Sequence, residues 1–164
     1  MFFLFLVTAG LPFAENHATG PFKSNLNGFS EVPAVLTTGS GALTVTVSSD
    51  QKSLDVTLKF SSLVGVAQSA SLYLGAPGTT GGAFAPICGG TKPSCPTAAS
   101  GSVTVTLMST DIAAVAAQGL AAGDLASVIP AIQNGVVYAN VITNKFPNGE
   151  IRGQLERGYS FGPN

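Results

Sequence analysis

Charged residues are scarce in this chain. Asp, Glu, Lys and Arg make up 9% of its 164 residues, whereas about a quarter is usual in a soluble domain. The formal net charge is −1, so no basic surface is indicated that would attract nucleic acid or an anionic membrane. Two explanations stay open. One is a secreted domain with an uncharged, hydroxyl-rich surface, glycosylated or not. The other is a subunit that buries much of its outside against copies of itself.

Histidine and cysteine are also sparse, which limits the metal chemistry available. The chain has one histidine, His17, and two cysteines, Cys88 and Cys95. A zinc site would need further ligands close by, so we predict no metal. The short Gly/Pro-containing stretch CGGTKPSC can bend to bring its two sulfurs together, and we therefore predict a Cys88–Cys95 disulfide. A disulfide implies an oxidising compartment outside the cytosol, so we expect an extracellular or cell-surface protein.

The common catalytic motifs are missing. There is no G-x-S-x-G nucleophile elbow, and no histidine is placed to act as a base for a Ser or Cys nucleophile. The glycine pairs at residues 81–82 and 89–90 lack the Lys-Ser/Thr partner and the following helix of a phosphate-binding loop. Glu31 and Glu150 could be considered as a glycosidase pair, but no cleft signature accompanies them. We predict a protein that is not an enzyme, with no catalytic residue and no cofactor.

The one long apolar run is the N-terminal stretch MFFLFLVTAGLPFA. It is shorter than the about 20 residues that a membrane-spanning helix needs, so we expect no integral membrane span. It can be a secretory signal ending near Ala14, although no Lys or Arg precedes it. It can equally be a retained strand that is buried by addition to the sheet of a neighbouring subunit. On that second interpretation the residues that make the contact are Phe2, Phe3, Leu4, Phe5, Leu6 and Val7.

Alternating apolar and polar residues predict a series of antiparallel strands. Residues 43–47 and 54–60 form a hairpin around a polar reversal at residues 49–52. Further strands are expected at residues 66–74, 103–107, 136–142 and 151–155, the last two joined by a turn at Pro147-Asn148-Gly149. The fold class predicted is all-β, an antiparallel immunoglobulin-like sandwich or barrel.

Two short helices are expected in the second half of the chain. The first covers residues 109–119, begins at Ser109 or Thr110 and stops at Gly119. The second runs from Asp124 towards Ile132, although Pro130 disfavours it.

The chain is expected to form one domain. We divide it into an apolar N-terminal segment (1–20), a sandwich domain (21–158) and a C-terminal tail (159–164). Residues 75–101 read as a long irregular connection, which in a compact domain is usually functional or a contact surface. Phe84, in the stretch up to Cys95, is therefore a further candidate for an assembly contact.

Three blocks of sequence resemble the CHRD domain, the module first recognised in chordin. They are FSEVPAV at residues 29–35, ASLYLGAPG at residues 70–78, and NVITNKFPNGEIRGQ at residues 140–154. The resemblance implies an immunoglobulin-like sandwich. It also implies three histidines able to hold a transition metal, but Ser71, Tyr73 and Ile142 stand at those positions. We therefore expect no metal-dependent function here.

Glu31, Glu150 and Arg152 lie in the first and last of these blocks. They could form an ionic patch that binds a ligand. We favour a structural ion pair instead, in which Arg152 bridges the carboxylates and fastens the first strand to the last.

The main functional hypothesis is a non-catalytic extracellular structural protein whose partners are copies of itself, assembled into a filament, sheath or surface layer. The alternative is a monomeric secreted module that recognises a surface polysaccharide or a protein partner through its loops. The state of the N-terminus separates the two, since only the first requires that the apolar segment be retained.

Overall fold

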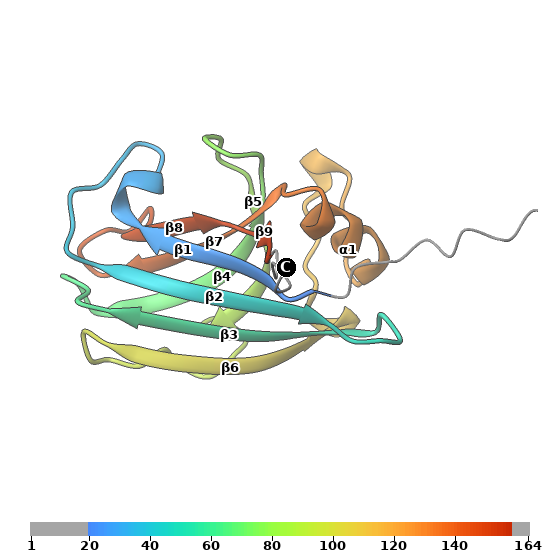
Figure 1. Cartoon of the computed structure of the whole chain (residues 1–164), viewed down its shortest axis with the longest axis horizontal. Coiled ribbons are helices and arrows are strands. Elements are labelled where there is room, and N and C mark those ends of the chain that lie inside the picture. The colour runs from blue at the N-terminus through green and yellow to red at the C-terminus, as the bar shows by residue number, and fades with distance from the viewer. Residues whose placement is uncertain (1–19, 159–164) are drawn as a thin grey trace, which may run out of the picture.

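The computed structural model describes residues 20–158 of the chain (Figure 1). Its main feature is one antiparallel sheet of nine strands that curls into a nearly closed barrel, and the predicted all-β class is confirmed. The strands are β1 (Phe22–Asn27), β2 (Ser40–Val47), β3 (Ser53–Ser61), β4 (Ala67–Leu74), β5 (Gly82–Cys88), β6 (Gly101–Met108), β7 (Val137–Thr143), β8 (Ile151–Gln154) and β9 (Glu156–Arg157).

The strand order is β5-β4-β7-β8-β1-β2-β3-β6, and β9 pairs with β1. The edge strands β5 and β6 approach each other without pairing as strands, which leaves the barrel open along one seam. The helix α1 (Leu125–Gln133) lies at one end of the barrel, and the loop over residues 28–39 lies at the other (Figure 1). This loop holds the short 3-10 turn η1 (Gly28–Ser30).

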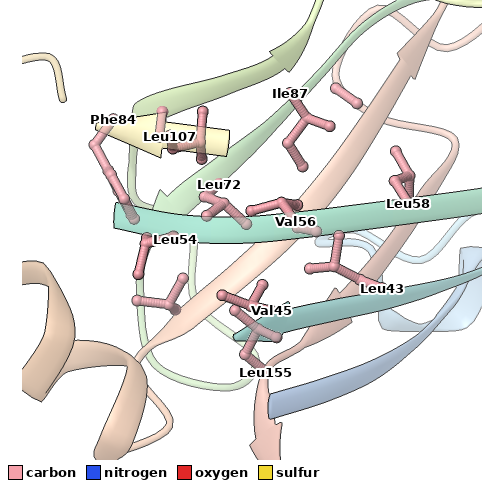
Figure 2. Close-up of a cluster of buried hydrophobic side chains, with 14 of the residues drawn as sticks. Leu43, Val45, Leu54, Val56, Leu58, Leu72, Phe84, Ile87, Leu107 and Leu155 are labelled. Carbon is pink, nitrogen blue, oxygen red and sulfur yellow. The ribbon is translucent and has the colours of Figure 1, made fainter. Parts of the chain in front are cut away.

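The core is built from the alternation that the sequence shows. In the β2–β3 hairpin, Val45 lies opposite Val56 and Leu43 opposite Leu58. Their side chains point into the barrel together with Leu72 and others from the facing strands (Figure 2). Each fully buried aliphatic side chain of this size contributes about 1.5–3 kcal/mol relative to exposure. The predicted hairpin is thus confirmed, and it supplies much of the inner surface.

Residues 75–101 are more ordered than expected, because they contain β5. Two register shifts against β4 interrupt its pairing, and Pro86 breaks the alternation, so the period-two signal is lost. Phe84 lies on this strand and is 1% exposed. The prediction that Phe84 is an assembly contact is therefore wrong, since its ring belongs to the core (Figure 2).

The expected helix at residues 109–119 does not form. Two 3-10 turns replace it, η2 (Ser109–Asp111) and η3 (Ala116–Gln118). An isolated bridge between Val115 and Leu120 closes a tight reversal here, and Gly119 takes the positive φ of +78° that the reversal requires. The backbone N–H and C=O groups of this segment therefore form the hydrogen bonds of the reversal and not those of a continuous helix.

The second expected helix does form, as α1, although Pro130 lies inside it. Asp124 caps its first turn by accepting a hydrogen bond from Ser127 N at 3.0 Å. One face of the helix is buried in the core: Leu125, Val128, Ile129 and Ile132. This burial offsets the hydrogen bond that proline cannot donate. No helix within residues 20–158 is long and apolar enough to cross a membrane.

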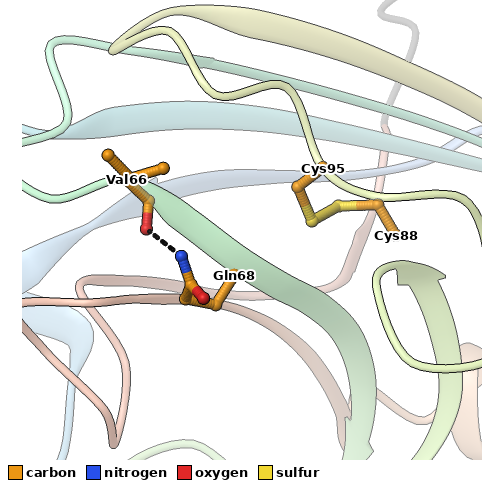
Figure 3. Close-up of a disulfide and its surroundings, with 4 residues drawn as sticks. All are labelled: Val66, Gln68, Cys88 and Cys95. Atoms are coloured by element: carbon orange, nitrogen blue, oxygen red, sulfur yellow. Dashed lines mark hydrogen bonds between the residues drawn. A yellow bond between two sulfur atoms is a disulfide. The ribbon is translucent and has the colours of Figure 1, made fainter.

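The Cys88–Cys95 disulfide is present, with a Cα–Cα distance of 5.0 Å (Figure 3). It ties the end of β5 to the following loop. Lys92, inside the disulfide loop, forms an ion pair with Asp111 at 2.7 Å and so fastens the loop to η2. The segment proposed for strand donation, residues 2–7, lies outside the described residues.

Candidate functional site

Strand β7 is buried on both faces, whereas its alternation suggested a half-buried strand. Val137 and Val141 face the core, while Tyr138 and Asn140 on the opposite face are only 3% and 6% exposed. Tyr138 lies opposite Tyr73 of β4, and Asn140 lies opposite Arg152 of β8. Together with Glu31 these side chains form a second interior outside the barrel, which we call the polar cluster: Glu31, Tyr73, Tyr138, Asn140 and Arg152.

A stack of three side chains forms one half of the polar cluster. The rings of Tyr73 and Tyr138 are stacked with centroids 5.0 Å apart, and the Arg152 guanidinium lies 3.5 Å from the centroid of the Tyr138 ring. Arg152 Nη2 donates a hydrogen bond to the Thr79 carbonyl at 2.6 Å, and Gly81 N donates one to the Tyr138 hydroxyl at 3.1 Å. The loop between β4 and β5 is therefore held over the stack.

The expected ion pair of Arg152 with Glu31 and Glu150 needs correction. Within residues 20–158, the one ion pair closer than 4.0 Å is that of Lys92 with Asp111. Arg152 instead donates a hydrogen bond to the Thr79 carbonyl and makes a cation–π contact with the Tyr138 ring. Its charge acts on Glu31 only at a distance longer than that of an ion pair. Sequence spacing could place these groups on neighbouring strands, but it could not show that Arg152 lies over an aromatic ring.

Glu150 instead holds two loops in place. It lies just before β8 and is fully buried. Its carboxylate accepts hydrogen bonds from Thr37 Oγ1 at 2.7 Å, from Val64 N at 2.6 Å and from Gly65 N at 3.0 Å. Burial opposes the charged form, but these hydrogen bonds outweigh it and lower the pKa of Glu150. The charge of Glu150 thus joins the β1–β2 and β3–β4 loops to the end of the sheet.

Glu31 is the opposite case. Its side chain is 7% exposed, and its Oε1 has no hydrogen-bond partner. Burial raises the pKa of Glu31 to about 7, and the nearby positive charge of Arg152 only partly offsets this. Asn140 Oδ1 is likewise buried without a partner. The pKa values of the two buried carboxyl groups of this region are therefore shifted in opposite directions, that of Glu31 upward and that of Glu150 downward.

The positions that resemble the family's histidines surround the polar cluster without forming a ligand set. Tyr73 belongs to the stack, Ser71 lies opposite Asn140, and Ile142 lies opposite Ser69. Among the described residues, no group of three or more His, Cys, Asp or Glu side chains is arranged to hold a metal ion.

Sequence reasoning missed the part that Tyr138 and Asn140 play in this cluster. Both alternate with apolar residues in β7, and that alternation by itself predicts a strand with one buried face only. The signal that could have found them is the size and polarity of the side chains at register positions 73, 138, 140 and 152, which share one face of three adjacent strands.

The outer edge of the barrel offers a different kind of site. Within residues 20–158, β6 pairs with β3 over all eight of its residues, without a register shift, and with no other strand. It contains no charged residue and no proline. Val103 and Val105 pack against the core but are only partly buried, and within residues 20–158 the neighbouring edge strand β5 approaches β6 without pairing with it.

These features define an all-β module with a buried polar cluster and one unprotected strand edge. The family model of the CHRD domain matches residues 22–155, so the chain belongs to the CHRD domain family, whose domain is of the extracellular type. No curated protein and no solved structure matches the chain significantly.

Proposed function

We propose that this protein is a non-catalytic extracellular structural module that associates with copies of itself, as the subunit of a filament, sheath or surface layer. The observation that carries the proposal is the unprotected edge of β6. The sparse charge of the chain supports it, since a surface with few charges resists association poorly.

Edge strands of soluble proteins are normally protected against pairing with other chains. Charged side chains, prolines, bulges and shortness are the usual devices. Strand β5, at one edge of the sheet, carries two of them, namely Pro86 and an irregular register. Strand β6, at the other edge, carries none (Figure 1). The two edges therefore differ in the way expected if only β6 accepts a further strand.

An added strand would complete the core at this edge. It would pair with the outward N–H and C=O groups of β6, and it would cover Val103 and Val105, which are now partly exposed. The chain offers a suitable donor in residues 2–7, an uncharged apolar segment of high β propensity. At about 3.3 Å per residue such a segment extends about 20 Å, a length that β6 can accommodate.

The test compares two substitutions at one position of β6 in the full-length protein. Val105→Lys places a charge at the edge that an added strand would have to bury, whereas Val105→Thr keeps the shape without the charge. Light scattering and negative-stain microscopy measure the assembly, and thermal melts confirm that both variants fold. We expect assemblies from the native protein and from Val105→Thr, and monomers from Val105→Lys.

Mass spectrometry of the mature protein decides whether residues 2–7 are available. A strictly monomeric native protein whose N-terminal segment has been removed would contradict self-assembly through this segment.

A second candidate function is a monomeric module that binds a polysaccharide or protein partner. It is favoured by two exposed apolar side chains of the β1–β2 loop, Phe29 at 74% and Leu36 at 85%. On this alternative the loop end of the barrel contacts the partner. A Leu36→Ser variant would then lose partner binding in a pull-down, while Val105→Lys would keep it.

A further inference from the structure

Two buried oxygen atoms of the polar cluster border the same small space. An ideal Cβ built on Gly149 would collide with both Glu31 Oε1 and Asn140 Oδ1. Neither oxygen has a hydrogen-bond partner. Buried acceptors without a partner are rare, because they lose their hydrogen bonds to water and gain none within the protein. A hydrogen bond donated by one group to the other would satisfy both.

Asn140 cannot supply that hydrogen. Its Nδ2 donates to the Asn148 carbonyl at 3.0 Å, and a flipped amide would set Oδ1 against this carbonyl, acceptor against acceptor. Of the two groups, Glu31 is therefore the one that can donate. A protonated Glu31 carboxyl provides it, as an O–H donor to Asn140 Oδ1.

We propose that Glu31 is a proton-operated latch, which holds the β1–β2 loop against the polar cluster while its carboxyl is protonated and releases the loop when the carboxyl ionises. The bond formed in the closed state is the O–H···O hydrogen bond from Glu31 to Asn140. On ionisation the proton leaves to solvent, and a carboxylate and an amide oxygen are left facing each other.

The groups around Glu31 favour this behaviour. Arg152 of β8 is the neighbouring cation, but it is already held by the Thr79 carbonyl and the Tyr138 ring. Tyr73 of β4 stays neutral, since burial first, then Tyr138 and the charge of Glu31, raise the pKa of Tyr73. The other carboxylate of the region, Glu150, is occupied by its own donors.

Burial raises the pKa of Glu31 to about 7, so the latch changes state close to neutral pH. The loop that it holds displays Phe29, Val32 and Leu36, three of the exposed large apolar side chains. Glu31 follows η1 directly and lies among them. Release would therefore change how these apolar side chains are presented, with no effect required on the barrel.

The test is an NMR titration of the full-length protein, which follows the Glu31 side-chain carboxyl carbon and the methyl groups of Val32 and Leu36. We expect all three to shift with one midpoint near the raised pKa of Glu31, about 7. As the pH rises from about 4.5 towards that midpoint, amide exchange in residues 28–39 should speed up by as much as about tenfold per pH unit beyond the intrinsic rate, and above the midpoint this extra acceleration should level off.

Two variants complete the experiment. Glu31→Gln carries a permanent N–H donor towards Asn140, so its loop should stay closed and the transition should vanish. Glu156→Gln removes an exposed carboxylate of β9 instead and should titrate like the native protein. The latch is refuted if Glu31 titrates with an ordinary midpoint near 4.5, or if it titrates near 7 while the signals of Val32 and Leu36 stay still.

Discussion

Removing the charge of Glu150 should destabilise the barrel by an amount that depends on pH. The change is Glu150→Gln, which keeps the size of the side chain. The carboxylate of the native residue accepts hydrogen bonds from Thr37 Oγ1, Val64 N and Gly65 N. A glutamine keeps one accepting oxygen, so its amide group is turned towards at least one of these donors.

The magnitude follows from those bonds. A hydrogen bond to a charged group contributes about 1.5–3 kcal/mol, and a buried donor left without a partner costs about 1–3 kcal/mol. Val64 is 42% exposed, so in the variant water can accept a hydrogen bond from Val64 N and reduce the cost of losing the carboxylate there. We expect Glu150→Gln to lower the free energy of unfolding by about 2–4 kcal/mol at pH 7, which corresponds to a fall in Tm of roughly 5–12 °C.

The pH dependence has a definite sign. The hydrogen bonds lower the pKa of folded Glu150 below its ordinary value of 4.5, so its stabilisation is complete above that value and is lost as the pH falls through the folded pKa. The gap between the native protein and Glu150→Gln should therefore narrow on acidification below pH 4.5.

Denaturant unfolding followed by circular dichroism at several pH values measures this gap. The exposed Glu156→Gln serves as the control and should change stability by less than about 0.5 kcal/mol. The assigned role of Glu150 would be refuted if Glu150→Gln lowered the free energy of unfolding by less than about 0.5 kcal/mol at pH 7. It would also be refuted if the difference in unfolding free energy between this variant and the native protein did not change with pH.

Two further substitutions test other contacts of the fold. Arg152→Met keeps the length of the side chain but loses the bond to Thr79 and the cation–π contact, so chemical denaturation should show a loss of about 2–4 kcal/mol; a loss below about 0.5 kcal/mol would show that the stack is not stabilising. Replacing Cys88 and Cys95 by serine opens a short loop and should cost about 2–3 kcal/mol, while the melting curve of the native protein in reductant should approach that of the variant. If the variant instead melts like the oxidised native protein, the disulfide does not stabilise the fold.

Regular strands were predictable, because their two faces have different environments. Strands β2, β3 and β6 alternate cleanly, and the structure places them as the sequence indicates. Strand β5 was missed because its bulges and Pro86 remove the alternation. For the α1 helix, Pro130 received too much weight in the prediction from sequence, since burial of the apolar face of the helix outweighs the effect of the proline.

The polar cluster was only partly predictable. The sequence singled out Glu31, Glu150 and Arg152, and the structure buries all three. It forms no ion pair among them, because Arg152 and Glu150 bind groups that carry no sequence signal and Glu31 Oε1 has no hydrogen-bond partner. Arg152 and Glu150 contact backbone carbonyl and N–H groups, and loop backbone has no pattern that distinguishes one residue from another.

The most direct test of the account is amide hydrogen exchange in β6, measured on the full-length protein over a wide range of concentration. If a strand of a second copy adds to this edge, the outward amides of β6 become protected as the concentration rises, and Val105→Lys abolishes that protection. Exchange in β6 that is equally fast at every concentration, in a protein that still assembles, would show that copies of this chain meet elsewhere.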